Sequence, residues 1–356
     1  MGKIKRRPTR VVYVGDVGIG GDNRIVIQSM TNTPTKDVSK TLNQINKLYE
    51  SGCEIVRVAV PDDDSLYALK DICKNSPIPV VADIHFNYKY AIKAIDFGIS
   101  KLRINPGNIG EIWKVKEVVK AAKEKRVPIR IGVNAGSLEK DILQKYGHPT
   151  PEAMVESALR HVQILEDLDF YDIVISLKAS DILTTIEAYK LMARKRDYPL
   201  HIGITEAGTI FSGAVRSAVG LGILLYEGIG DTIRVSLTGD PVEEIKTAFL
   251  ILEGLGLRED FVRVISCPTC ARAEINVEDL AKKVENALIG FRKNLHVAVM
   301  GCAVNGPGEA READYGIAGG KGEGLIFKKG KIIGKYKEGE LVERLLEVIK
   351  KDKDNG

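Results

Sequence analysis

The chain has 356 residues, of which 44% are hydrophobic and 28% charged, and its formal net charge is +4. This length exceeds one ordinary core, so two domains are expected, and the composition excludes the disordered and fibrous classes. The small net charge gives no reason to expect nucleic acid as a partner. The longest apolar run, residues 218–226, is too short to cross a bilayer, and no signal-peptide core follows the basic residues 3–7. We therefore expect a cytoplasmic protein without a membrane partner.

Short β-branched runs alternate with segments of helical period over most of the chain. A Gly-rich segment, Val11–Asp22, comes first and predicts a hairpin that closes the bottom of the fold. The predicted strands that follow are Ile25–Met30, Glu54–Val60, Pro79–Asp83, Lys101–Asn105, Pro128–Val133, Asp172–Leu177, Leu200–Ile204 and Thr232–Leu237. Strands of this kind, each followed by a helix, favour a TIM (β/α)8 barrel over residues 1–258. An open doubly wound sheet is the alternative fold.

The pattern changes in residues 259–356. The strands Val262–Ile265 and His296–Met300 flank a predicted helix, Val277–Phe291, and a hairpin turning at Lys329-Gly330 precedes a last helix. This order predicts a small α+β domain.

Cations and polar groups recur near the carboxyl ends of the predicted barrel strands, the end that we call the mouth. Catalytic side chains of TIM barrels lie at this end. The cations are Arg57, Arg103, Arg130, Lys178 and Arg234, and the polar groups include Asp83, His85, Asn134, Thr205, Glu206 and Ser236. Cations from separate strands favour a phosphate or diphosphate ligand, although any one of them could instead face a helix carboxylate. Glu206, a carboxylate among them, is a candidate acid or base.

Three of the five cysteines lie in two loops of the second domain. Cys267 and Cys270 are two residues apart in their loop, and Cys302 opens the Gly/Pro-rich segment that reaches Glu309. A structural zinc site would need a fourth Cys or His, and a redox pair would leave Cys302 unused. A cubane iron–sulfur cluster with an oxygen ligand or substrate on its fourth iron is the interpretation that uses all three thiols. Glu309 is then either that ligand or a solvated carboxylate.

The other two cysteines, Cys53 and Cys73, follow apolar patterns and are expected in the core. The odd total argues against a disulfide framework.

Several blocks of the chain together resemble the 4-hydroxy-3-methylbut-2-enyl diphosphate synthase family. The blocks are Arg57–Pro61, Ala82–Phe86, Leu102–Asn108, Gly203–Gly208, Ser266–Cys270 and Cys302–Glu309, in the order that the family shows. The resemblance spans nearly the whole chain and matches the two-domain bacterial form. It implies reductive ring opening and dehydroxylation of 2-C-methyl-D-erythritol 2,4-cyclodiphosphate in the non-mevalonate isoprenoid pathway.

The resemblance also implies roles for individual residues. A [4Fe-4S] cluster would be held by Cys267, Cys270, Cys302 and Glu309, in a domain like those of sulfite and nitrite reductases. The diphosphate would be bound by Arg57, Arg103, Arg130, Asn134, Lys178 and Ser236. Glu206, helped by Thr205, would serve proton transfer. Flavodoxin or ferredoxin would donate electrons to a head-to-tail homodimer. The alternative function is a phosphate-ligand-binding barrel with a structural zinc module.

Overall fold

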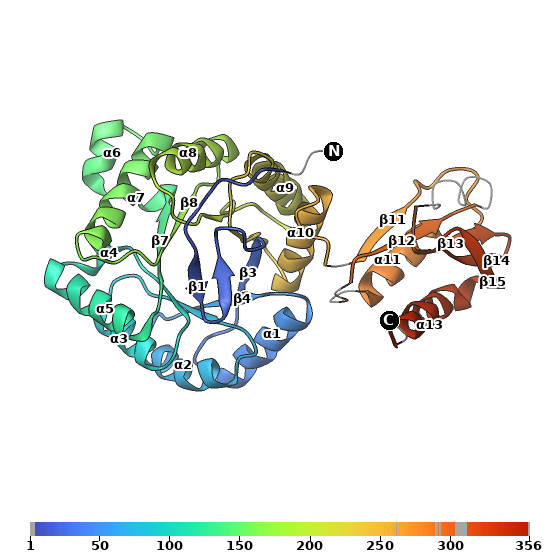
Figure 1. Cartoon of the computed structure of the whole chain (residues 1–356), viewed down its shortest axis with the longest axis horizontal. Coiled ribbons are helices and arrows are strands. Elements are labelled where there is room, and N and C mark those ends of the chain that lie inside the picture. Colours follow the sequence, from blue (N-terminus) through green and yellow to red (C-terminus); the bar gives the residue numbers. More distant parts are fainter. Residues whose placement is uncertain (1–3, 261, 289–290, 292, 303–311, 355–356) are drawn as a thin grey trace. The chain divides into compact units, whose positions relative to one another are not determined.

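The computed structural model describes residues 4–260, 262–288, 291, 293–302 and 312–354. The chain divides into two compact units, Met1–Arg258 and Glu259–Gly356, each with its own hydrophobic core (Figure 1). Among the described residues, no helix combines the length and apolar character needed to cross a membrane.

The first unit is a parallel barrel, which confirms the predicted TIM-barrel fold. Its described strands are β3 (Val26–Met30), β4 (Ile55–Ala59), β5 (Val80–Asp83), β6 (Lys101–Arg103), β7 (Ile129–Asn134), β8 (Ile173–Lys178), β9 (His201–Ile202) and β10 (Thr232–Ile233). The hydrogen-bonded order runs β8-β7-β6-β5-β4-β3-β10-β9, and a parallel bridge between Ile175 and Leu200 joins its two ends. The ring is closed in this way, so the open-sheet alternative is excluded.

Helices surround the strands (Figure 1). They are α1 (Val38–Glu50), α2 (Asp63–Asn75), α3 (Tyr88–Asp96), α4 (Pro106–Ile109), α5 (Ile112–Lys125), α6 (Lys140–Tyr146), α7 (Pro151–Glu166), α8 (Ile182–Lys195), α9 (Ile210–Tyr226) and α10 (Pro241–Gly254). Many begin at a side chain that accepts a backbone N–H of the first turn, as Asp62, Asp181 and Asp240 do. These caps fix where each strand-to-helix loop ends at the mouth.

The predicted hairpin is present as β1 (Val12–Val14) and β2 (Val17–Ile19), which pair antiparallel. Val14 and Ile19 are fully buried against Val26, Ile55 and Val81, which lie at or near the amino ends of three barrel strands. The hairpin therefore covers the base of the barrel, the end opposite the mouth.

Two buried carboxylates at the base, Glu54 and Asp231, are paired with arginines. Glu54 accepts the Ile27 N–H at 2.8 Å and forms ion pairs with Arg258 at 3.1 Å and Arg24 at 2.6 Å. Asp231 forms an ion pair with Arg6 at 2.7 Å. Each carboxylate thereby joins a segment outside the barrel strands to the start of a strand.

The second unit is an α+β domain, as predicted. Its sheet has the order β11 (Val262–Ser266), β12 (Leu295–Met300), β13 (Tyr315–Gly320), β14 (Glu323–Lys328) and β15 (Lys331–Lys337), with the first three strands parallel and the rest antiparallel. The helices α11 (Val277–Ala287) and α13 (Leu341–Asp354) share one hydrophobic core with the sheet. The described carboxyl ends of β11 and β12 lead to the cysteine loops.

Candidate active site

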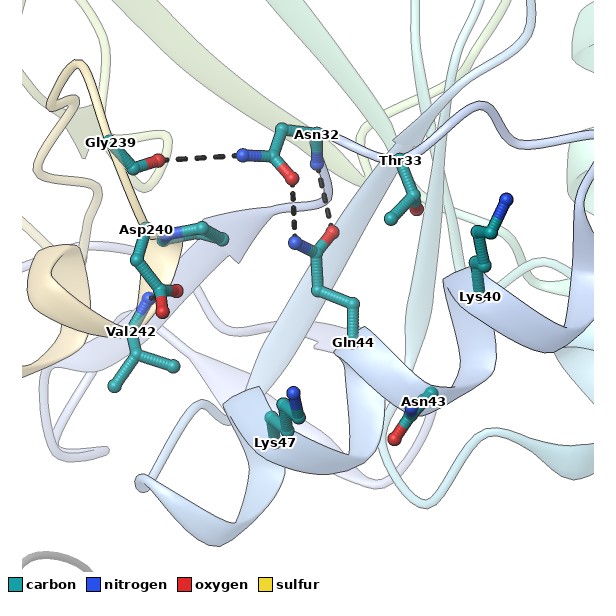
Figure 2. A pocket seen from close by; sticks show the side chains of 10 residues that line it. Asn32, Thr33, Lys40, Asn43, Gln44, Lys47, Gly239, Asp240 and Val242 are labelled. Carbon is teal, nitrogen blue, oxygen red and sulfur yellow. Dashed lines mark hydrogen bonds between the residues drawn. The ribbon is translucent and has the colours of Figure 1, made fainter.

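The loops that follow β3 and precede α10 meet at the rim of the mouth, around a pocket of about 370 Å³ (Figure 2). Asn32 Oδ1 accepts a hydrogen bond from Gln44 Nε2 at 2.6 Å, and the Asn32 backbone N–H donates to Gln44 Oε1 at 2.9 Å. The Asn32 side-chain amide donates to the Gly239 carbonyl at 3.4 Å. These side chains satisfy one another, so we interpret the pocket as a junction that holds two mouth loops together.

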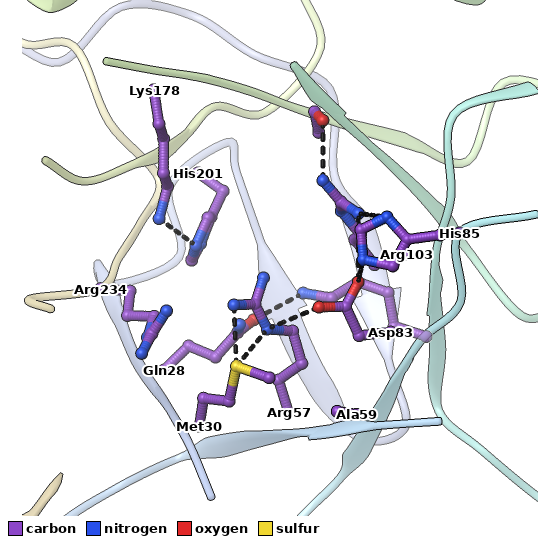
Figure 3. Close-up of polar contacts among 12 residues, drawn as sticks. Gln28, Met30, Arg57, Ala59, Asp83, His85, Arg103, Lys178, His201 and Arg234 are labelled. Carbon is purple, nitrogen blue, oxygen red and sulfur yellow. Dashed lines mark hydrogen bonds and ion pairs between the residues drawn. The ribbon is translucent and has the colours of Figure 1, made fainter. Parts of the chain in front are cut away.

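The predicted convergence of cations inside the mouth is confirmed (Figure 3). Five different strands carry or directly precede these cations, which are Arg57, Arg103, Arg130, Lys178 and Arg234. The charges of the four arginines each lower the pKa of another cation in the set. Arg103, Arg130 and Lys178 are only 5%, 1% and 7% exposed. Buried like charges at close quarters repel one another, so this arrangement favours an anionic ligand.

Asp83 lies between two of the arginines. Its carboxylate is 3.2 Å from Arg103 Nη1 and 3.6 Å from Arg57 Nε. Burial raises the pKa of the Asp83 carboxyl, but the charges of Arg57, Arg103 and Arg130 outweigh burial, so the pKa lies below its usual value. Asp83 therefore stays ionised and fixes the directions of the two guanidinium groups.

Further contacts complete the orientation of these arginines. Arg103 also approaches His85 Nδ1 at 3.1 Å and donates to the Gly132 carbonyl at 2.9 Å. Arg57 donates to Met30 Sδ at 2.9 Å. Both arginines are thus held by the barrel before any ligand binds.

Arg130 differs from its neighbours in the number of unsatisfied guanidinium nitrogens, which is two in Arg130 and one each in Arg103 and Arg234 of the described structure. Within the described part of the chain, its Nε and Nη1 have no hydrogen-bond partner, although the residue is 1% exposed. An unpaired buried donor is costly, and a phosphate oxygen is the acceptor that a guanidinium binds best.

Arg234 and Ser236 lie just beyond β10. Glu244 of α10 accepts Ser29 Oγ–H at 2.7 Å and the Leu237 N–H at 3.1 Å, and lies 3.4 Å from Arg234 Nη2. This buried carboxylate therefore fixes the loop that carries Ser236, whose side chain is half-buried.

Lys178 ends β8 and contacts a histidine that the sequence analysis missed. Its Nζ lies 3.3 Å from His201 Nε2 (Figure 3). His201 Nδ1 lies 2.5 Å from Thr232 Oγ1. The only signal in the sequence was a polar residue at the start of an apolar strand. Asn134 is the register partner of Lys178 and ends β7, so both predicted binding residues reach the same level of the mouth.

Thr205 and Glu206 follow β9 on the mouth side. Thr205 donates its N–H to the Ala179 carbonyl at 3.3 Å, and Glu206 has a left-handed backbone with φ of 53°. The Glu206 side chain is exposed, and no hydrogen bond or ion pair joins it to the cations in the described structure. Its position is compatible with a group that meets the ligand from the solvent side.

Two cysteines of the second unit, Cys267 and Cys302, lie beyond the carboxyl ends of neighbouring parallel strands. Cys267 directly follows β11, and Cys302 follows the neighbouring parallel strand β12 after Gly301. The Gly301 N–H donates to Cys267 Sγ at 3.1 Å. Glu309 belongs to residues 303–311, which lie outside the described residues. Among the residues that are described, no three His, Cys, Asp or Glu side chains are arranged to hold a metal ion.

The chemistry of the cysteine loops nevertheless fits a thiolate-ligated cluster. A Cβ at Gly301 would lie 2.6 Å from Val277 Cγ2, so only glycine allows the close approach that places its N–H on the sulfur. Cys270 is exposed, and hydrogen bonding by Arg272 lowers the pKa of its thiol. The lowered pKa of Cys270 favours the thiolate form that binds metal, and an N–H directed at a sulfur is a contact that cluster thiolates accept.

The remaining cysteines lie apart from these loops, as expected. Burial raises the pKa values of Cys53 and Cys73 to about 12. Cys53 is buried in the barrel core, and Cys73 packs against that core.

Comparison with known proteins covers both units. Residues 9–249 match the model described as the GcpE TIM-barrel domain, and residues 263–351 match the GcpE protein C-terminal domain. The chain is 61% identical over 346 residues to the 4-hydroxy-3-methylbut-2-en-1-yl diphosphate synthase (flavodoxin) of Clostridium perfringens, covering 97% of this chain and 99% of the relative. The relative of the same name from Thermodesulfovibrio yellowstonii is 59% identical, with 98% and 100% covered.

Among solved structures, a Xanthomonas albilineans dihydropteroate synthase aligns with a TM-score of 0.49 and 11% identity, over 70% of this chain and 98% of that one. The two matched domain models and the high identity to the curated relatives agree with each other over nearly the full length. This chain therefore belongs to the GcpE family.

Proposed function

We propose that this chain catalyses the reductive ring opening and dehydroxylation of 2-C-methyl-D-erythritol 2,4-cyclodiphosphate, giving 4-hydroxy-3-methylbut-2-enyl diphosphate. As a GcpE family member it is an oxidoreductase of non-mevalonate isoprenoid biosynthesis. The observation that carries the substrate class is Arg130, a buried guanidinium with two unpartnered nitrogens among the described residues. A diphosphate would supply both the missing acceptors and the negative charge that the mouth lacks.

The diphosphate would be bound by the residues at the carboxyl ends of the strands. They are Arg57, Arg103, Arg130, Asn134, Lys178 and Ser236. Arg57 and Arg103 are oriented by Asp83, so they offer their remaining N–H groups without a loss of side-chain freedom on binding. The rest of the substrate would then project from the mouth toward solvent, where Glu206 is exposed.

Removal of a hydroxyl group requires electrons and a proton. Glu206 would hold or deliver that proton, and the neighbouring Thr205 hydroxyl would help to orient it. Cys267, Cys270, Cys302 and Glu309 would hold a [4Fe-4S] cluster, which supplies the electrons and a Lewis-acidic iron for the departing oxygen. The cations and the cysteines lie in different compact units, so the proposed chemistry would require a barrel and a cluster domain to meet.

Three further assignments accompany this function, namely the electron donor, the oligomeric state and the location. The curated relatives carry flavodoxin in their names, so we propose flavodoxin as the electron donor, with ferredoxin as the alternative. We also propose a head-to-tail homodimer in which the cluster domain of one protomer covers the barrel of its partner. The cytoplasm is the proposed location.

The test starts with protein purified under anaerobic conditions. We expect about four irons and four sulfides per chain, a brown chromophore that dithionite bleaches, and turnover of the cyclodiphosphate. Cys302→Ser should lose the chromophore and the turnover, whereas Cys73→Ser, a change in the barrel unit, should keep both. Glu309→Ala should lose most activity and keep part of the chromophore. Zinc without sulfide, after anaerobic reconstitution, would instead support the phosphate-binding barrel with a structural metal.

A further inference from the structure

His201 is a fully buried histidine that the proposed chemistry does not use. It begins β9, its ring faces the barrel interior, and its Nε2 lies 3.3 Å from Lys178 Nζ (Figure 3). Its Nδ1 lies 2.5 Å from Thr232 Oγ1. Burial, followed by the charges of Lys178, Arg130, Lys101 and Arg57, holds the pKa of His201 well below its usual value. The imidazole is therefore neutral and has one donor and one acceptor nitrogen.

Gly203, which directly follows β9, also defines the position of Lys178. A Cβ at Gly203 would lie 2.6 Å from Lys178 Nζ and 3.1 Å from its Cε. The lysine side chain therefore crosses over Gly203, from the end of β8 toward β9, and reaches the imidazole across a position that carries no side chain. Gly203 and His201 together define the position of the Lys178 amine.

We propose that His201 is a positioning residue for Lys178, which it holds at the mouth in both protonation states, so that Lys178 takes up a proton from solvent when a diphosphate binds. This inference rests on the proposed function, because it concerns the same anion site.

The same atoms of Lys178, His201 and Thr232 form the hydrogen bonds in both protonation states of Lys178. When Lys178 is unprotonated, His201 Nε2–H donates to its amine, and the Thr232 hydroxyl donates to Nδ1. When Lys178 is protonated, its ammonium donates to Nε2, and Nδ1–H donates to Thr232 Oγ1. The second state contains one more proton than the first, and the threonine hydroxyl serves as donor in one and as acceptor in the other.

The charges that surround Lys178 decide which state is populated. Burial and then Arg130, Arg234 and Arg57 hold the pKa of Lys178 well below its usual value, while Glu244 opposes them. A diphosphate adds negative charge to this group of cations and raises that pKa in the complex. The complex then binds more protons than its separate parts, so the affinity for diphosphate falls as the pH rises between the two pKa values of Lys178.

Calorimetry with inorganic diphosphate and the full-length cluster-loaded protein tests this proposal. Titrations at one pH in buffers of different ionisation enthalpy give the number of protons taken up. The wild type should take up about one proton more than Lys178→Met, because the ionisation of diphosphate itself is common to both. His161→Gln changes another buried histidine, which contacts Gly107 and Glu139 instead of Lys178, and should leave the uptake unchanged.

Substitutions at His201 separate positioning from a purely structural role. His201→Leu should weaken diphosphate binding about tenfold and raise KM with little change in kcat, because the ammonium loses its acceptor. His201→Gln keeps a polar group near the position of Nε2 and should restore most of the affinity. Thermal unfolding of each variant identifies any general loss of stability.

Equal proton uptake by the wild type and Lys178→Met would overturn the proposal. Wild-type affinity in His201→Leu, or equal losses in the Leu and Gln variants, would overturn it as well. Both results leave diphosphate binding by the wild type, and hence the proposed function, intact. A wild-type protein that does not bind diphosphate would instead overturn the proposed anion site together with this inference.

Discussion

The two ends of the barrel differ in how many of their buried charges have a partner of opposite sign. At the base, Glu54 is paired with Arg258 and Arg24, and Asp231 is paired with Arg6. At the mouth, the carboxylates of Asp83 and Glu244 contact three of the surrounding cations, while the guanidinium of Arg130 keeps two unpartnered nitrogens in the described structure. The same kinds of residue therefore stabilise the fold at one end and leave an excess of positive charge at the other.

This difference indicates where the structure is incomplete without a ligand. Burying a charge costs free energy unless a partner compensates it, and at the base Glu54 and Asp231 have arginine partners within the chain. Lys101 at the start of β6 is the exception, because among the described residues its ammonium contacts only the Gln28 amide oxygen, at 3.1 Å. At the mouth, five cations surround two carboxylates, so an anion from solution must supply part of the compensation. Substitutions at the two ends should consequently have different effects on stability and on ligand affinity.

The largest effect should come from the base. Glu54→Gln leaves the buried Arg258 without its carboxylate and weakens the link to Arg24, so we expect the free energy of unfolding of the barrel to fall by about 3–5 kcal/mol. Urea unfolding followed by circular dichroism measures this loss. Asp197→Asn, which breaks the exposed pair with Arg10, is the control and should cost below about 1 kcal/mol.

The folded fraction of the Glu54→Gln protein should bind inorganic diphosphate with the same affinity as the wild type. A large loss of affinity at unchanged stability would show that the base contributes to the ligand site, and the contrast between the two ends would fail.

The mouth should respond in the opposite sense. Arg130→Met removes a buried cation that repels Arg57 and Arg103, so in the absence of ligand the free energy of unfolding should rise by about 1 kcal/mol. The same change should weaken binding of inorganic diphosphate about 100-fold, because charge-assisted hydrogen bonds to the phosphate are lost. Unfolding curves with and without diphosphate give both quantities.

Lys120→Met is the matched control for the change in net charge, because Lys120 is exposed on the outer helix α5. It should alter neither value. A destabilised Arg130→Met protein with unchanged affinity would mean that Arg130 is a structural residue.

The sequence predicted which side chains of a single strand face the mouth, because strand periodicity determines that. Arg103 and Asn105 are two residues apart and both contact Gly132, and Asp83 and His85 both approach Arg103, as alternation along a strand requires. Periodicity says nothing about contacts between distant strands. The contact of Lys178 with His201 and that of Glu244 with Ser29 depend on side-chain length and barrel closure, so only the structure reveals them.

The cysteine loops show the same limit. The spacing of Cys267 and Cys270 predicted a metal centre, but their proximity to Cys302 depends on the pairing of β11 with β12, a fact of topology. The exposure of Glu206 was likewise not encoded in any local pattern, since its left-handed backbone turns the chain just after β9. The roles proposed for these residues remain predictions.

The smallest effect should appear in the acid dependence of stability, where the two ends again differ in sign. The pKa of Asp83 at the mouth is lowered, as described above, whereas burial raises the pKa of Asp231 at the base despite the Leu200 N–H and the charges of Arg6 and Arg7. The stabilisation from ionised Asp83 is complete above the unfolded pKa of about 3.9 and is lost as the pH falls through the lower folded value. The stabilisation from protonated Asp231 is complete below the unfolded pKa and is lost as the pH rises through the folded value.

Unfolding free energies measured between about pH 3 and 6 therefore distinguish the two carboxyls. The loss of stability on acidification should be shallower in Asp83→Asn than in the wild type, and steeper in Asp231→Asn. Identical slopes in the two variants would mean that the mouth arginines do not hold Asp83 ionised, and that the excess positive charge lies elsewhere in the barrel.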